Sequence, residues 1–209
     1  LLPGLNPLGV PKNLSNTVFP FHYNDFDELL KIVEENNIGV IKMEVVRNFG
    51  PKNDFLAKVK NLAIKKKIVL IFDECTSGFR ETFGGIHKKF GVNPDLALFG
   101  KSIGNGYPIT ALVGKDSIME HCKDTFISST FWSDRIGPTA GLATLHEMER
   151  LKSWDRISAI GNKIKRNWKK IAYNHKLDIS IQGISSLPNF YFKNRNNLIY
   201  KTFITSIQR

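Results

Sequence analysis

The sequence predicts an α/β domain built on a mostly parallel sheet. Apolar runs of four or five residues alternate with longer amphipathic segments, and several of these runs end at a charged residue. Buried parallel strands have this continuous apolar character, and the connection between two of them is usually a helix. The chain has 209 residues, of which 42% are hydrophobic. That composition suits one domain or slightly more, and it argues against wholesale disorder.

The first half of the chain is expected to supply two helices and three strands. Asp25, with Glu28 three residues later, forms a capping-box pattern that opens a helix to about Asn36. A second helix is expected over residues 54–66, where apolar side chains share one face. Residues 1–24 hold four of the nine prolines and predict an extended arm. The strands are expected at residues 39–43, 68–72 and 96–99.

The second half begins with a strand at 109–113 and a helix at 136–151, and it then changes character. Residues 154–176 predict one or two helices, and two strands are expected at 177–181 and 190–192. Residues 1–150 hold 18 Lys+Arg and 17 Asp+Glu, whereas residues 151–209 hold 12 and 2. We therefore expect a boundary near residues 150–155, with the last two strands belonging to a second unit.

The excess positive charge allows two interpretations. Five basic residues occur close together: Lys163, Lys165, Arg166, Lys169 and Lys170. They could bind the phosphates of a nucleic acid, or they could form the solvated face of a helix. No recognised nucleic-acid-binding motif accompanies the charge.

Charged residues stand at the ends of three predicted strands: Glu44, Asp73 and Lys101. Ligands of open α/β sheets bind beyond the carboxyl ends of the strands, so Asp73 and Lys101 could share one pocket. A partly desolvated lysine there can attack a carbonyl and form a Schiff base. An aspartate that faces a pyridinium nitrogen would keep the ring protonated. Alternatively, Asp73 caps a turn and Lys101 is solvated.

Other ligand classes fit less well. The glycine-rich segment Gly100–Pro108 is not a P-loop, because Asp95 stands where that motif requires glycine. It also lacks the Gly-x-Gly-x-x-Gly order of dinucleotide sites. The five histidines show no metal-ligand spacing, so no metal is expected.

Three segments carry a family resemblance. Residues 71–80 read IFDECTSGFR, and Asn93-Pro-Asp-Leu96 is followed by FGKSIGNGYP at 99–108. Ser129-Thr130 is then followed by Gly137-Pro138. In this order and spacing they resemble the class-III aminotransferases, which use pyridoxal 5'-phosphate (PLP). The glutamate-1-semialdehyde 2,1-aminomutases are the most similar branch.

The resemblance implies the fold and the site. The fold would be that of fold type I PLP-dependent transferases, with residues 1–150 in the PLP-binding large domain and residues 151–209 starting a truncated C-terminal small domain. Lys101 would be the catalytic residue and would hold PLP as a Schiff base, and Asp73 would bind its pyridinium nitrogen. Glu44 and Thr76 would lie beside the cofactor. Thr130 would contact the phosphate of the neighbouring subunit, which implies a homodimer.

The resemblance also implies the reaction. Lys101 would take part in moving an amino group between small-molecule donors and acceptors, most like a glutamate-1-semialdehyde 2,1-aminomutase. Within the family, the alternative is transamination of another amino acid or a sugar. From another class, the alternative is a basic nucleic-acid-binding protein without catalysis. Two cysteines and the lack of a long apolar run favour a cytoplasmic protein without membrane partners.

The ends of the sequence suggest a longer protein. The first methionine is Met43, and the last residues still follow a periodic apolar pattern. Members of the resembled family are considerably longer. We therefore expect a fragment that lacks activity when isolated.

Overall fold

The computed structural model describes residues 6, 8–127, 130–131, 133–194 and 198–207. Its centre is a four-stranded sheet in the order β1-β2-β3-β4. The strands are β1 (Val40–Glu44), β2 (Val69–Asp73), β3 (Leu96–Phe99) and β4 (Ala111–Gly114). The first three are parallel, and β4 is antiparallel to β3. The predicted mostly parallel sheet is thus confirmed.

The direction of β4 follows from its connection. Between β3 and β4 the chain forms only a 3-10 turn at Lys101–Ile103 and a turn in which Tyr107 N–H donates to Gly104. A parallel strand needs a crossover of a dozen or more residues, so this shorter connection returns the chain in the opposite direction.

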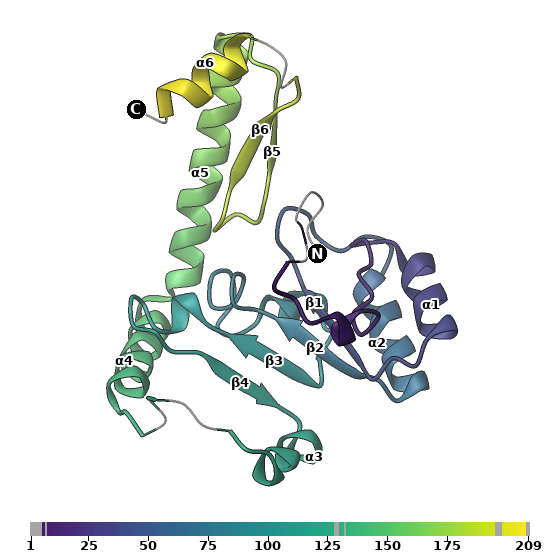
Figure 1. Ribbon diagram of the computed structural model, residues 1–209. Coiled ribbons are helices and arrows are strands. Elements are labelled where there is room, and N and C mark those ends of the chain that lie inside the picture. The colour runs from purple at the N-terminus through teal and green to yellow at the C-terminus, as the bar shows by residue number, and fades with distance from the viewer. Residues whose placement is uncertain (1–5, 7, 128–129, 132, 195–197, 208–209) are drawn as a thin grey trace.

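Two helices cover one face of β1 and β2. They are α1 (Phe26–Glu35) and α2 (Phe55–Lys66), which pack together at the β1 end of the sheet (Figure 1). The backbone N–H of Glu28 donates to the Asp25 carboxylate at 3.0 Å, which confirms the predicted cap. The Glu28 carboxylate accepts instead from the N–H of His22, at 2.5 Å, so the capping box is not reciprocal. Apolar side chains of both helices and both strands form one continuous core: Leu29, Val33, Ile41, Met43, Phe55, Leu56, Val59, Leu62, Leu70 and Phe72.

The other face of the same strands is open. Ile41 and Met43 point into the core, so the alternation of strand side chains puts Lys42 and Glu44 on the opposite face. In β2 the same alternation places Asp73 on this open face. The polar residues at the carboxyl edge therefore lie on the side that α1 and α2 do not cover.

The C-terminal part rises away from the sheet (Figure 1). Helix α4 (Ile136–Leu151) lies at the β4 end. Residues 154–176 are predicted to form one or two helices, and the structure has one long helix there, α5 (Ser153–Asn174). Strands β5 (Ile179–Gln182) and β6 (Asn189–Phe192) form an antiparallel hairpin beside α5, and α6 (Leu198–Ile207) follows. No described helix is both long and apolar enough to cross a membrane.

The remaining described elements are short. They are one helix, α3 (Asp116–Met119), and four 3-10 turns at Lys12–Leu14, Ile86–Phe90, Lys101–Ile103 and Glu120–Asp124. The short turn at Lys12–Leu14 lies within the arm that the prolines predict.

Candidate active site

The carboxyl edge of the sheet brings four of the five predicted site residues together. Glu44 and Asp73 are the last residues of β1 and β2 and are register partners. Lys101 follows β3, the next strand in the sheet. Thr76 stands in the loop after β2, and its hydroxyl accepts a hydrogen bond from the Lys101 amine at 2.7 Å. Thr76 thus contacts Lys101 directly, and Asp73 ends the strand next to the one that precedes Lys101.

The backbone at Lys101 is unusual. Its φ angle is 47°, in the left-handed region that residues with a side chain seldom adopt. Such a conformation costs about 1–2 kcal/mol and concentrates at functional sites. The residue opens a 3-10 turn, and its side chain is exposed. The turn therefore presents a solvent-accessible amine at the sheet edge.

The loop that holds Thr76 is packed tightly. A Cβ on Gly78 would lie 2.7 Å from both the Glu74 carbonyl oxygen and the Phe99 ring, so only glycine allows this approach. The Arg80 guanidinium donates to the Thr76 carbonyl at 2.7 Å. These contacts restrain the backbone of the loop from which the Thr76 hydroxyl reaches the Lys101 amine.

Asp73 has two partners on its carboxylate. The backbone N–H of Cys75 donates to Oδ1 at 3.1 Å, and the Lys42 ammonium lies 2.9 Å from Oδ2. Burial by itself would raise the pKa of Asp73, but hydrogen bonds from Lys42 and Cys75 and the Lys42 charge outweigh it, so the net pKa is lowered. Asp73 is therefore a carboxylate at neutral pH. The Cys75 contact also shows that Asp73 does cap the following turn.

A buried hydrogen-bond network around Glu74 stabilises the loop that follows Asp73. The Glu74 side chain is fully buried, and its Oε1 accepts from the backbone N–H of His87 at 3.0 Å. The His87 ring nitrogen Nδ1 lies 2.9 Å from the same oxygen, and the Ser77 hydroxyl donates to Oε2 at 2.5 Å. Burial raises the pKa of Glu74, but these hydrogen bonds lower it further than burial raises it. Sequence reasoning missed this network, because Glu74 and His87 become neighbours only in the fold.

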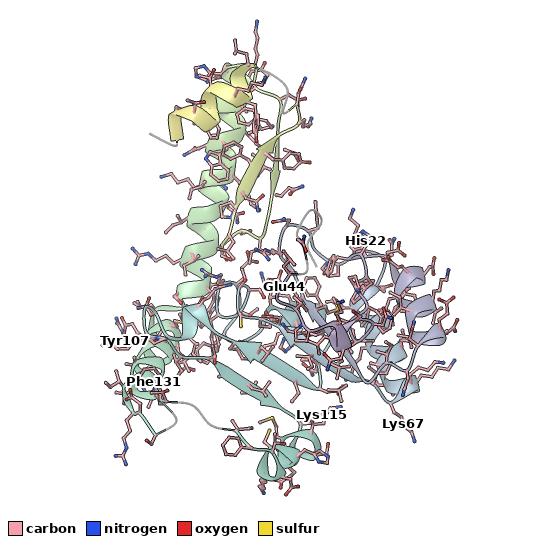
Figure 2. All side chains as sticks on the ribbon, viewed as in Figure 1. His22, Glu44, Lys67, Tyr107, Lys115 and Phe131 are labelled. Atoms are coloured by element: carbon pink, nitrogen blue, oxygen red, sulfur yellow. The ribbon has the colours of Figure 1, made fainter. Side chains whose placement is uncertain are left out.

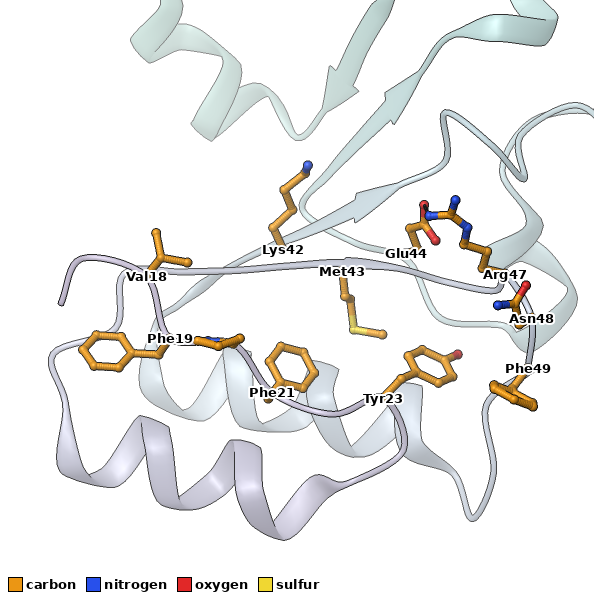
Figure 3. Close-up of a pocket in the computed structure, with 11 residues that line it drawn as sticks. Val18, Phe19, Phe21, Tyr23, Lys42, Met43, Glu44, Arg47, Asn48 and Phe49 are labelled. Carbon is orange, nitrogen blue, oxygen red and sulfur yellow. Dashed lines mark hydrogen bonds and ion pairs between the residues drawn. The ribbon is translucent and has the colours of Figure 1, made fainter. Parts of the chain in front are cut away.

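Glu44 faces a cavity of about 460 Å³ beside the N-terminal arm (Figure 3). Its carboxylate lies 3.4 Å from the Arg47 guanidinium. In Figure 3 Lys42 and Glu44 point to one side of β1 and Met43 to the other. The cavity is lined by Val18, Phe19, Pro20, Phe21, Tyr23, Lys42, Met43, Glu44, Arg47, Asn48 and Phe49. Glu44 therefore belongs to a pocket adjoining the Asp73 carboxylate through Lys42.

Thr130 does not join this group. It is exposed, and Phe131 beside it lies near α4, well separated from Glu44 (Figure 2). Ser129, the other half of that motif, lies outside the described residues. Phe131, beside Thr130, thus lies near α4, the helix that contacts the Lys101–Ile103 turn.

Lys42 is a site residue that sequence reasoning missed. It is the one charged residue inside the apolar strand Val40–Met43, two positions before Glu44. Residues two apart in a strand share a face, so this spacing could have placed Lys42 beside the strand-end carboxylates.

The residues at this edge fit PLP. The Lys101 amine is accessible for bonding to an aldehyde carbon, and an ionised Asp73 is the group that holds a pyridine nitrogen protonated. When bound, PLP supplies an electron sink for carbanion chemistry. Lys101 and Asp73 thus supply the amine and the carboxylate that PLP needs on this side of the site.

Comparison with known proteins agrees with this chemistry. Residues 28–203 match the family model "Aminotransferase class-III". The chain is 37% identical over 206 residues to a 3-aminobutyryl-CoA aminotransferase of Cloacimonas acidaminovorans, covering 94% of this chain and 50% of that protein. It is 39% identical over 203 residues to a glutamate-1-semialdehyde 2,1-aminomutase of Sulfolobus acidocaldarius, covering 93% and 46%.

Comparison with solved structures shows the fold. An omega-transaminase from Sphaerobacter thermophilus superposes with a TM-score of 0.81 at 23% identity, over 90% of this chain and 45% of that one. The chain spans about half the length of the curated relatives it matches. The family resemblance, the fold type and the PLP cofactor expected from the sequence are therefore confirmed. The chain belongs to the class-III aminotransferase family of PLP-dependent enzymes.

Proposed function

We propose that the full-length protein transfers amino groups with PLP bound at Lys101. One observation carries this proposal: an accessible lysine amine and an ionised aspartate follow neighbouring parallel strands at the carboxyl edge. An amine and a carboxylate in this arrangement match the two ends of the PLP ring system. Among the described residues, no comparable arrangement supports a nucleic-acid-binding function.

Each residue has a defined task in this proposal. Lys101 would hold the cofactor through its amine, and the same amine would carry the proton that is moved in amino-group transfer. Thr76 orients that amine through the 2.7 Å hydrogen bond. Asp73 keeps the ring nitrogen protonated, and Glu44 lies at the rim of the site. These roles fit the geometry of the carboxyl edge.

The assembly and the domain boundary are also proposals. Thr130 is exposed, which fits a role at the phosphate of a second subunit in a homodimer. We place the boundary between a PLP-binding domain, residues 1–150, and a smaller domain, residues 151–209. Lys152, at a φ of 45°, breaks α4 from α5 at this point. A cytoplasmic location accords with the two unpaired cysteines.

The leading substrate proposal is glutamate 1-semialdehyde, and the second is an amino-acyl or other amino compound. Relatives of similar identity carry both kinds of name, an aminomutase at 39% and a 3-aminobutyryl-CoA aminotransferase at 37%. An assay of the full-length protein with glutamate 1-semialdehyde alone separates them. Conversion without an added donor or acceptor supports the aminomutase, and conversion only with a second substrate supports a transaminase.

The cofactor proposal is tested by the absorbance spectrum of the full-length protein mixed with PLP. We expect a visible band in the wild type that is absent from Lys101→Ala. Lys58→Ala is the control, because Lys58 is exposed on α2 and pairs with no acidic side chain among the described residues. The band should persist in that control. A wild-type spectrum identical to that of Lys101→Ala would refute the proposal.

A further inference from the structure

Lys42 is a charged residue in the middle of β1, and its ammonium group is directed at the expected cofactor partner. Its Nζ lies 2.9 Å from Oδ2 of Asp73 on the neighbouring strand. The Lys42 side chain is 55% exposed, whereas Asp73 is 22% exposed. The lysine therefore approaches Asp73 from the open side of the sheet, where a ligand would also approach.

Both oxygens of the Asp73 carboxylate have donors in the structure. Oδ1 accepts from the backbone N–H of Cys75, which the turn fixes, and Oδ2 faces Lys42. A carboxylate oxygen can accept more than one hydrogen bond, so a third donor can still bind. A pyridinium N–H placed there would share Oδ2 with Lys42 or Oδ1 with the backbone N–H of Cys75.

We propose that Lys42 is a positioning residue that shares the Asp73 carboxylate with the cofactor ring. By sharing it, Lys42 weakens the interaction between Asp73 and the ring nitrogen. This inference rests on the proposed function, in which Asp73 binds that nitrogen. Lys42 keeps Asp73 ionised and oriented before the cofactor binds. Once the ring is in place, two positive groups compete for one carboxylate.

The direction of the effect follows from the charges around Asp73. The Lys42 ammonium acts on Asp73 directly, Glu44 is its register partner on β1, Cys75 in the next loop donates a hydrogen bond, and the charge of Lys101 after β3 acts on Cys75. A positive charge beside a pyridinium disfavours the protonated ring, so Lys42 lowers the pH at which the ring nitrogen loses its proton. Removal of Lys42 leaves Asp73 free to pair with the ring alone. Because the pair is partly exposed, the effect is modest, about two- to fivefold in affinity.

The test uses the full-length holoenzyme and three variants. Lys42→Met removes the charge and keeps the chain length, Lys42→Arg keeps the charge, and Lys58→Met removes an exposed lysine on α2 that pairs with no described acid. Two quantities are measured for each: the PLP dissociation constant by equilibrium dialysis, and the ¹⁵N shift of ring-labelled PLP as a function of pH. The ¹⁵N shift reports ring protonation, which a merely structural change in the strand would not move.

We expect Lys42→Met to bind PLP about two- to fivefold more tightly and to keep the ring nitrogen protonated to higher pH. Lys42→Arg and Lys58→Met should match the wild type in both measurements. Unchanged or weaker PLP binding by Lys42→Met, or an unchanged ¹⁵N titration, would overturn the inference. Lys42→Gln, which is polar and uncharged, repeats the test if Lys42→Met folds poorly.

The two proposals fail in different ways. If PLP binds and its visible band depends on Lys101, but Lys42 has no influence on the ring nitrogen, only the inference about Lys42 is wrong. If no band forms in the wild type, the proposed function itself is wrong.

Discussion

At the scale of single residues, the hydrogen bond from Lys101 to Thr76 determines where the reactive amine points. Thr76→Val keeps the shape of the side chain and removes the acceptor that lies 2.7 Å from the amine. A hydrogen bond of this kind contributes about 1 kcal/mol, which corresponds to about a fivefold change in rate. We therefore expect kcat of the full-length enzyme to fall about threefold to tenfold in steady-state assays.

Thr76→Ser is the matched control for this substitution, because it retains the hydroxyl. Its kcat should stay within about twofold of the wild type, since the hydrogen bond remains possible. Equal losses in the valine and serine variants would contradict the assignment, because they would show that kcat responds to any change of this side chain and not specifically to loss of the hydroxyl.

Asp95 gives a pH-dependent contribution to stability. Its carboxylate lies 2.8 Å from Lys60 and 2.7 Å from Lys115, and it accepts from the backbone N–H of Leu70 at 2.9 Å. Burial raises the pKa of Asp95, but these partners lower it to about 2, from 3.8. A lowered folded pKa stabilises the fold above the unfolded pKa, and this contribution is lost as the pH falls through the folded value.

We expect the wild type to lose about 2 kcal/mol of unfolding free energy from Asp95 between about pH 4 and pH 2. In Asp95→Asn this part of the pH dependence should be absent, because the amide does not titrate. Denaturant unfolding of the full-length proteins at several pH values measures the difference. A difference between the two proteins that does not change across this pH range would contradict the assignment.

The strand-end residues could be proposed from sequence, but their partners could not. Glu44, Asp73 and Lys101 each end an apolar run, and this pattern is visible without a structure. The roles assigned to them and to Thr76 and Thr130 remain predictions. Lys42 was missed because its contact with Asp73 depends on how the two strands align, and that alignment is not encoded in either run alone.

At the scale of elements, secondary structure was predictable where apolar periodicity was strong. Helix α4 and strand β3 have the predicted bounds, and α2 begins one residue later than expected. The antiparallel direction of β4 was not anticipated, because it depends on how the turn after Lys101 closes. Helix α3 is only four residues long, too short for a periodic pattern to reveal it.

The basic residues of α5 divide between two environments. Lys163, Arg166, Lys169 and Lys170 are exposed, whereas Lys165 donates to the carbonyl of Gly183 at 2.6 Å. Trp168, on the same helix, packs against the Phe190 ring of the hairpin. This arrangement matches a helix with one solvated basic face and one packed apolar face.

The turn between β5 and β6 is attached to the sheet by a small set of polar contacts. The Glu81 carboxylate accepts from the backbone N–H of Ser186 at 3.0 Å, and the Asn48 carbonyl accepts from the N–H of Gly183 at 3.0 Å. The Lys89 ammonium lies 2.5 Å from the Glu81 carboxylate, and the Glu81 side chain is only 8% exposed. These contacts couple the C-terminal hairpin to the loop that lines the cavity beside Glu44.

We expect Glu81→Ala to loosen this attachment, because the Ser186 N–H loses its acceptor. Loss of about 1–2 kcal/mol corresponds to roughly tenfold faster amide exchange around Ser186. Hydrogen exchange followed by mass spectrometry measures it, and Glu147→Ala, which breaks only the exposed pair with Arg150, is the control. Unchanged exchange around Ser186 would mean that the hairpin is held by its other contacts.

At the scale of the whole molecule, the proposed cofactor residues and most of the excess positive charge lie in different parts of the chain. Residues 1–150 are nearly neutral and hold the proposed cofactor residues, whereas residues 151–209 carry most of the positive charge. The chain spans about half the length of the curated relatives it matches. If Thr130 contacts the cofactor phosphate of a second subunit, the proposed site depends on the proposed homodimer.

The central claim is that Lys101 is the residue that bonds PLP. Reduction of the full-length protein and PLP with borohydride, followed by proteolysis and mass spectrometry, locates the attached cofactor on one peptide. We predict that the modified lysine is Lys101 and that Lys42, on the other side of Asp73, is unmodified. Attachment at another lysine, or no attachment under conditions where the protein is folded, would contradict this account of the site.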